Sequence, residues 1–295
     1  MQENLRASEK NIKGGWKVKM ETSNLTKKRI REYLDVGKRF DGRKLLEHRN
    51  IEIEIGVSKN AEGSARVKLG NTEVIAGIKL DISEPYPDHE DEGTMMTTME
   101  LLPLSSEEFE YGPPKIDAIE IARIIDRGIR ESGMIDFKKL CVKKGEKVWT
   151  VFIDLDSIND DGNLLDACAL AAIAALLTAK MPKYDDKKEK VCFGEWTSKK
   201  IPLSKDIPIT FTFHKIGQSF ILDPGKEEED SSEGRISIAV SCAKKDVMIN
   251  AMQKGGEEEF SAEEILKTIE SAEKKYKEIE KDVFGKIEKN IKEKK

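Results

Sequence analysis

The stretch NLLDACALAAIAALLTAK, residues 163–180, decides the fold of this chain. Apolar residues fill nearly every position instead of one stripe, which predicts a helix that is buried on all sides. Asn163 is a residue type that caps helix N-termini, and Pro182 stops the helix soon after the stretch. The run is alanine-rich and too short to span a bilayer. We therefore expect it to be the central buried helix of a soluble fold.

Period-two patterns before this helix predict a sheet. Residues 51–57 alternate isoleucine or valine with polar residues, mainly glutamate, as a strand with one buried face does. Gly70-Asn71-Thr72 separates two strand-like segments and is typical of a hairpin turn. The strands expected before this helix in the chain are 51–57, 65–69, 73–80, 94–104 and 147–158.

A second set of strands follows the helix. They are expected at 207–213, 220–223, 235–243 and 247–252. Ser261 and Glu264 then form a capping box that opens a last helix with a single apolar stripe. The order of elements predicts an α+β architecture with two β-rich halves, each backed by helices.

Domain bounds follow from this order. The N-terminal half is expected at about 41–182, the C-terminal half at about 190–260, and the last helix at about 261–290. Residues 1–23 lack apolar periodicity, so we expect a poorly ordered extension before the folded domain of 24–295. A further helix is predicted from Asn24, its expected cap, to Val36.

Three arginines share one face of the helix predicted at 117–132. Arg123, Arg127 and Arg130 lie opposite the apolar positions of this helix, and Lys115 precedes it. Guanidinium groups bind phosphate oxygens in a planar, bidentate way, so this face is a candidate phosphate-binding site. The alternative is a solvated face whose arginines pair with Glu120, Asp126 and Glu131.

Composition narrows the classes of function. The net charge is -5 with 36% charged residues, so any contact with nucleic acid must come from a local patch. The four cysteines contain no C-x-x-C pair, and we expect neither a disulfide framework nor a metal site. No signal peptide and no Walker or dinucleotide-binding motif is present, which favours a cytoplasmic protein without membrane contact or cofactor.

From Asp41 to about Phe260 the chain resembles the RNase PH family of phosphorolytic exoribonucleases, but the positions that carry the chemistry differ. Ile116-Asp117 stands where catalytic relatives have paired arginines. Gly162-Asn163-Leu164 replaces their Gly-Ser/Thr-Arg phosphate clamp, next to the repelling Asp160-Asp161. Asp230, in an acidic run expected as a solvated turn, matches one catalytic acid, and Ile236 occupies the second position. The resemblance therefore implies no catalytic residues in this chain.

Within the family, the sequence resembles the non-catalytic RNase PH-like subunits of archaeal exosome rings. This likeness implies the duplicated RNase PH-like fold, which is ribosomal protein S5 domain 2-like. It implies a hetero-hexamer in which three copies alternate with three copies of a catalytic RNase PH-like partner, with RNA-binding cap subunits and single-stranded RNA as further partners. It also makes RNA the expected ligand of Arg123, Arg127, Arg130 and Lys115, because this face would lie beside the partner's active-site cleft, where RNA is shortened from its 3′ end.

Two alternatives stay open at this point. The chain could be an active phosphate-dependent 3′-5′ exoribonuclease with a divergent site, which an activity assay on the isolated chain would reveal. It could also be an α+β protein with a small-molecule pocket and no role in RNA metabolism. Failure to co-purify with a catalytic partner, together with a lack of RNA binding at any salt concentration, would favour the latter.

Overall fold

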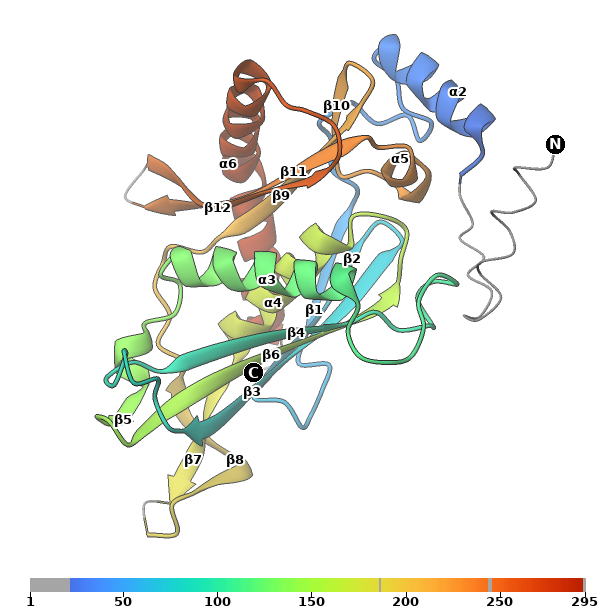
Figure 1. Cartoon of the computed structure of the whole chain (residues 1–295). Coiled ribbons are helices and arrows are strands. Elements are labelled where there is room, and N and C mark those ends of the chain that lie inside the picture. The colour runs from blue at the N-terminus through green and yellow to red at the C-terminus, as the bar shows by residue number, and fades with distance from the viewer. Residues whose placement is uncertain (1–21, 186, 244–245, 294–295) are drawn as a thin grey trace, which may run out of the picture.

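The computed structural model describes residues 22–185, 187–243 and 246–293, so the predicted extension lies, up to residue 21, outside the described residues. Two sheets enclose a layer of helices (Figure 1). The C-terminal helix α6 (Ala262–Glu293) packs on strands of both sheets. This is the α+β fold with two sheet-and-helix halves that the sequence predicts.

The larger sheet comes from the N-terminal half and has the strand order β1-β2-β3-β6-β4, with β5 added beside β6. Neighbouring strands are antiparallel, except that β4 runs parallel to β6. The strands are β1 (Ile51–Ile55), β2 (Gly63–Leu69), β3 (Thr72–Ser83), β4 (Thr94–Glu100), β5 (Cys141–Lys143) and β6 (Lys147–Asn159). The strand expected to reach residue 104 ends at Glu100, where a loop toward the next helix begins.

The smaller sheet has the antiparallel order β10-β9-β11-β12. Its strands are β9 (Ile209–Ile216), β10 (Ser219–Leu222), β11 (Gly234–Ala243) and β12 (Asp246–Gly256). A separate hairpin of β7 (Lys180–Asp185) and β8 (Lys190–Lys200) connects the halves. The sequence did not predict this hairpin, because its lysine-rich strands carry no regular apolar alternation.

Helix α4 (Leu164–Thr178) lies between the sheets, packed on β2 and β3 of the larger sheet and on β9 of the smaller. Its residues from Leu164 to Leu176 are all buried, which confirms the expected central helix. Helix α3 (Ile116–Glu131) lies beside it, against β4 and β12. Within the described residues no helix is both long and apolar enough to cross a membrane.

Asn163 does not cap α4 with its side chain, contrary to expectation. Its backbone adopts a left-handed conformation, with φ of 57°, and its side chain turns inward. The amide Nδ2 donates to Asp166 at 3.0 Å and to Asp223 at 2.8 Å. The side chain therefore joins the start of α4 to the segment after β10, a contact between the two halves.

The acidic run after Gly225 is also not a solvated turn. It forms the short helix α5 (Lys226–Asp230), in which Glu228 is buried and pairs with the buried Arg39. Helix α2 (Asn24–Asp35) is capped by Ser23 instead of the expected Asn24, because the Ser23 hydroxyl accepts the Thr26 N–H. The capping box of α6 is confirmed by two hydrogen bonds between Ser261 and Glu264.

Candidate nucleic-acid interface

Helix α3 presents one exposed basic face. Its opposite face, which includes Ala122, Ile125 and Ile129, is buried against the sheets, as its spacing predicts. Arg123 and Arg127 are exposed, one turn apart. Neither guanidinium has an ion pair or hydrogen bond within the part of the chain that the structure describes. Two unpaired cations on a rigid helix can bind consecutive phosphates without first breaking an internal contact.

Arg130 continues this face but is already engaged. Its guanidinium pairs with Asp126 at 2.9 Å, donates to the Met95 carbonyl at 3.2 Å, and lies 5.5 Å from the centre of the Phe137 ring. Met95 belongs to β4, so Arg130 ties the end of α3 to that strand. The structure thus divides the predicted set into two free arginines and one with a role in packing.

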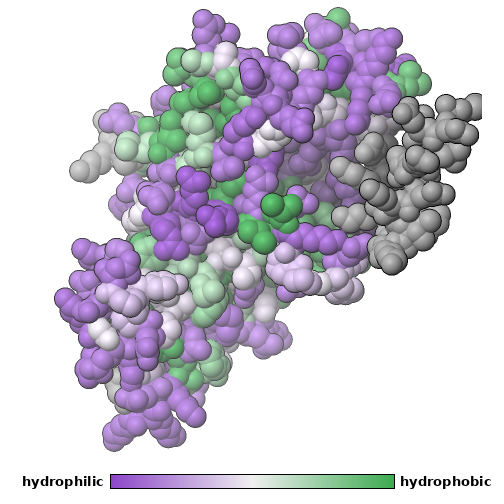
Figure 2. Space-filling view, in the orientation of Figure 1, coloured by the Kyte–Doolittle hydropathy of each residue, from purple (hydrophilic) through white to green (hydrophobic). Residues whose placement is uncertain are grey.

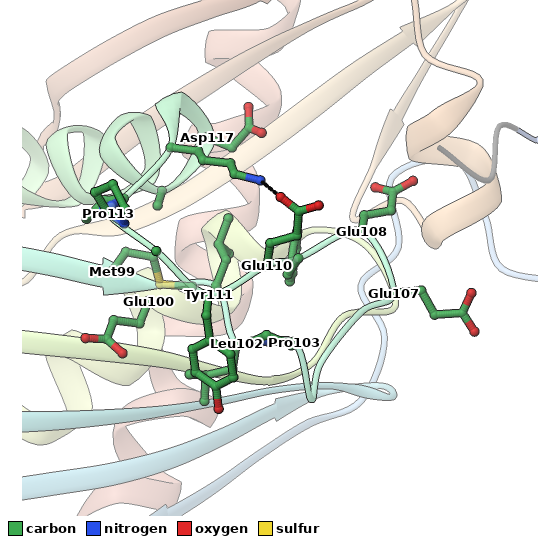
Figure 3. Close-up of a pocket in the computed structure, with 16 residues that line it drawn as sticks. Met99, Glu100, Leu102, Pro103, Glu107, Glu108, Glu110, Tyr111, Pro113 and Asp117 are labelled. Atoms are coloured by element: carbon green, nitrogen blue, oxygen red, sulfur yellow. Dashed lines mark hydrogen bonds and ion pairs between the residues drawn. The ribbon is translucent and has the colours of Figure 1, made fainter. Parts of the chain in front are cut away.

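Lys115 lies at the N-terminal end of α3, at the mouth of a cavity of about 580 Å³ formed by β4, the following loop and the start of the helix. It pairs with Glu110 at 2.6 Å, and Glu107, Glu108 and Asp117 also line this cavity (Figure 3). Ile116 and Asp117, which the sequence resemblance predicts at the paired-arginine position of catalytic relatives, are both exposed. This end of the helix is therefore mainly acidic and apolar, and its lysine is paired with Glu110.

The N-terminus of α4 is closed by the protein's own carboxylates. The Asn163 N–H donates to Oε2 of Glu229 at 3.0 Å, and the Gly162 N–H donates to Oδ1 of Asp160 at 3.1 Å. Leu164, at the arginine position of the clamp, is buried. A helix N-terminus binds anions through free N–H groups, and here two N–H groups just before α4 already have internal carboxyl partners.

Lys226 lies among these carboxylates. Its Nζ is 3.3 Å from Asp160 and 3.6 Å from both Glu108 and Asp230. Burial lowers the pKa of Lys226, but the surrounding carboxylates outweigh burial and raise it. Burial raises the pKa of Glu229, and Asp160 raises it further. The lysine is therefore held as a counter-ion of the cluster and is not free to bind phosphate.

The two positions that the resemblance matches to catalytic acids, Asp230 and Ile236, lie in different environments. Asp230 accepts a hydrogen bond from the Thr22 hydroxyl at 3.0 Å and pairs with Lys226, so its carboxylate has internal partners. Ile236 is only 2% exposed and lies within β11, opposite Phe213 of β9. The second position is thus part of the hydrophobic core. In the described residues no group of three His, Cys, Asp or Glu side chains could hold a metal ion.

Arg49 fixes the loop before α4, a role that the sequence does not indicate. Its guanidinium donates to the carbonyls of Asp161 and Gly162 at 2.8 and 2.9 Å, and to Oδ1 of the buried Asp223 at 2.7 Å. Burial raises the pKa of Asp223, but the hydrogen bonds and charge of Arg49 bring it down to about 2. Asp223 is 174 residues away in the chain, so no local pattern could have revealed this contact.

Comparison with known proteins gives matches over both halves. The model described as 3′ exoribonuclease family, domain 1, matches residues 47–182, and domain 2 of that family matches residues 206–275. The exosome complex component Rrp42 of Methanothermobacter thermautotrophicus is 45% identical over 251 residues, 85% of this chain and 91% of the relative.

Two solved structures are similar in both sequence and fold. A chain of the Archaeoglobus fulgidus exosome with RNA bound to the active site is 39% identical with a TM-score of 0.75, covering 84% of this chain and 93% of that one. A chain of an archaeal exosome core is 35% identical with a TM-score of 0.76, covering 88% and 96%.

Proposed function

Because this chain belongs to the 3′ exoribonuclease family, also called RNase PH, we propose that it is a non-catalytic, RNA-binding subunit of an exosome ring. The relatives named above are exosome components, and the chain covers nearly their whole length. In this proposal the chain works in the cytoplasm with a catalytic RNase PH-like partner, three copies of each alternating, and with RNA-binding cap subunits and single-stranded RNA.

The hydrogen bond between Asn163 N–H and Glu229 carries the non-catalytic part of the proposal. Phosphorolysis needs inorganic phosphate beside the scissile bond, and catalytic relatives hold it at this helix N-terminus. Glu229 already occupies this donor, Asp160 and Asp161 repel phosphate, and Leu164 supplies no charge. Ile236 can neither transfer a proton nor bind a cation. These departures come from three different elements and all weaken the same reaction.

Arg123 and Arg127 support the RNA-binding part. Both are exposed, and the guanidinium of neither has a partner among the described residues. Phosphate contacts position a strand without reading its bases, so this face would hold RNA of any sequence. In the ring it would lie beside the partner's active site and guide the 3′ end toward it. Arg130 and Lys115 would flank this contact, each held by its internal carboxylate.

The test compares the isolated chain with the chain assembled with its catalytic partner. Both are incubated with single-stranded RNA, magnesium and phosphate, and nucleoside diphosphates are measured. We expect no product from the isolated chain, phosphate-dependent product from the complex, and a hexamer in sedimentation. Phosphate-dependent turnover by the isolated chain, persisting after removal of contaminating nucleases, would instead establish the active enzyme with a divergent site. Separate sedimentation of the two chains at micromolar concentration would refute the ring.

A further inference from the structure

The β7–β8 hairpin projects from the body of the protein and presents aromatic and basic side chains. In Figure 1 it extends beyond the larger sheet at the end of the molecule away from α2. Trp196 is 46% exposed although it is a large apolar residue, and Phe193 is 56% exposed. The protruding part is mainly hydrophilic in Figure 2, with small hydrophobic patches on it. The fold does not bury these aromatic rings.

The pairing of the two strands brings an indole and two ammonium groups near one another. Lys180 is aligned with Lys200, and Pro182 with Trp196, with a register irregularity between these two pairs. Directly paired residues are neighbours across a two-stranded sheet. The side chains of Lys180, Lys200 and Trp196 are all exposed at these neighbouring positions, whereas Pro182 is buried, and we call this exposed surface the Trp196 face.

The two lysines form an uncompensated pair of like charges. Like charges at directly opposed positions destabilise a sheet. Neither ammonium group has a carboxylate partner within the described parts of the chain, although Lys183, nearby on β7, pairs with Glu195 at 3.0 Å. Glu195 of the hairpin therefore neutralises Lys183 and leaves the charges of Lys180 and Lys200 unbalanced. An anion would remove the repulsion.

We propose that this face is a second contact for single-stranded RNA, with the indole of Trp196 stacked on a base and Lys180 and Lys200 bound to neighbouring phosphates. Sites for single strands combine a basic track with aromatic side chains, because every base has a flat face for stacking. A protein partner fits less well, since lysine is depleted from the cores of protein interfaces. The inference rests on the proposed RNA-binding function and adds a site distant from α3 in sequence.

Tryptophan fluorescence tests this contact directly. The chain has three tryptophans: Trp149 is buried, and Trp16, outside the described residues, is changed to phenylalanine in every sample. The protein, free and assembled with its catalytic partner, is titrated with an oligouridine of twenty nucleotides. We expect RNA to quench the emission that is lost in the Trp196→Ala variant. That variant should bind RNA about 5-fold more weakly or worse, while Trp196→Phe, which keeps a ring for stacking, should retain affinity.

Salt dependence tests the lysines. Changing Lys180 and Lys200 together to glutamine should reduce the slope of log affinity against log salt by about 1.4, or about 0.7 for each phosphate. Lys183→Gln is the matched control, because it removes a lysine of the same hairpin that is already paired, and should leave the slope unchanged.

The outcomes separate this inference from the proposed function. If RNA binding depends on Arg123 and Arg127 but neither quenches Trp196 nor responds to the hairpin variants, only the inference is refuted. If the catalytic partner alone shields Trp196 and RNA adds nothing, the face is a protein interface and the inference is again wrong. A complete lack of RNA binding would overturn both. Quenching that persists in an Arg123→Gln, Arg127→Gln variant would support the hairpin contact independently.

Discussion

Replacing Arg123 and Arg127 together by glutamine should weaken binding of single-stranded RNA to the assembled ring about 25-fold at 0.1 M salt. Glutamine keeps a similar length and helix propensity and removes only the charge. The structure supplies the number of contacts, because these two guanidiniums are unpaired among the described residues. Arg130 is left out of this number because its guanidinium forms an ion pair with Asp126.

The magnitude follows from counterion release. For single strands, log affinity changes by about 0.7 for each phosphate contact over a tenfold change in salt, so two contacts give a slope difference of about 1.4. Relative to 1 M salt, where the electrostatic contribution vanishes, one contact contributes about 5-fold at 0.1 M and two contribute about 25-fold. The loss should be alike for any RNA sequence, because phosphates carry no base information.

The assay is fluorescence anisotropy of labelled RNA with the ring at several salt concentrations, alongside sedimentation to verify assembly. Two single variants serve as controls. Arg29→Gln removes an exposed charge from α2 and should leave the slope unchanged. Arg130→Gln should lower thermal stability through loss of its contacts to Asp126 and Met95, with little effect on the slope. An unchanged slope in the Arg123, Arg127 double variant, with an intact ring, would refute the reasoning and leave a merely solvated face.

Three further predictions concern the scaffold behind this face. Glu229→Ala should lower the free energy of unfolding by about 1–3 kcal/mol because it leaves the Asn163 N–H unpaired, whereas Glu229→Gln, which keeps an acceptor, should be nearly neutral; equal denaturant midpoints for the two variants would contradict this. Gly162→Ala should destabilise by at least about 2 kcal/mol, since φ is +84° and the new Cβ would lie 2.7 Å from backbone atoms of Gly225; an unchanged melting temperature would count against it. Burial first, and then Arg235, lower the pKa of His214 from 6.5 to about 3, so its contribution to stability is complete above pH 6.5 and falls as the pH drops toward 3. Between pH 7 and pH 4 the loss should be about 3 kcal/mol, and a His214→Phe variant that lost stability just as steeply in urea titrations would disprove this origin.

Sequence patterns predicted the elements in which the burial of one sheet face or one helix stripe sets the order of apolar and polar residues. The isoleucines of β1, the almost entirely apolar α4 and the capping box of α6 all have local causes, and each is confirmed. The pattern also separated the buried and exposed faces of α3. It also offered Asp126 as a partner for these arginines, which holds for Arg130, but it could not reveal the contact of Arg130 with the Met95 carbonyl of β4, 35 residues earlier in the chain.

Contacts between distant segments decided the remaining differences. The acidic run formed a helix because Arg39, 189 residues away, provides a buried partner for Glu228. Asn163 turned inward because Asp223 lies beside it in space and 60 residues away in sequence. The family resemblance predicts an altered phosphate clamp at Gly162-Asn163-Leu164, and the folded chain adds Glu229, a distant residue that accepts the Asn163 N–H.

The burial of α4 by both sheets has a consequence for how the nascent chain folds on the ribosome. The N-terminal half is synthesised first, at about 5–20 residues per second, and can cover α4 mainly with β2 and β3. The side of the helix that packs on β9 stays exposed until that strand has also emerged. During that interval an apolar helix surface is open to chaperones and to other nascent chains, so slowing translation between α4 and β9 should increase aggregation.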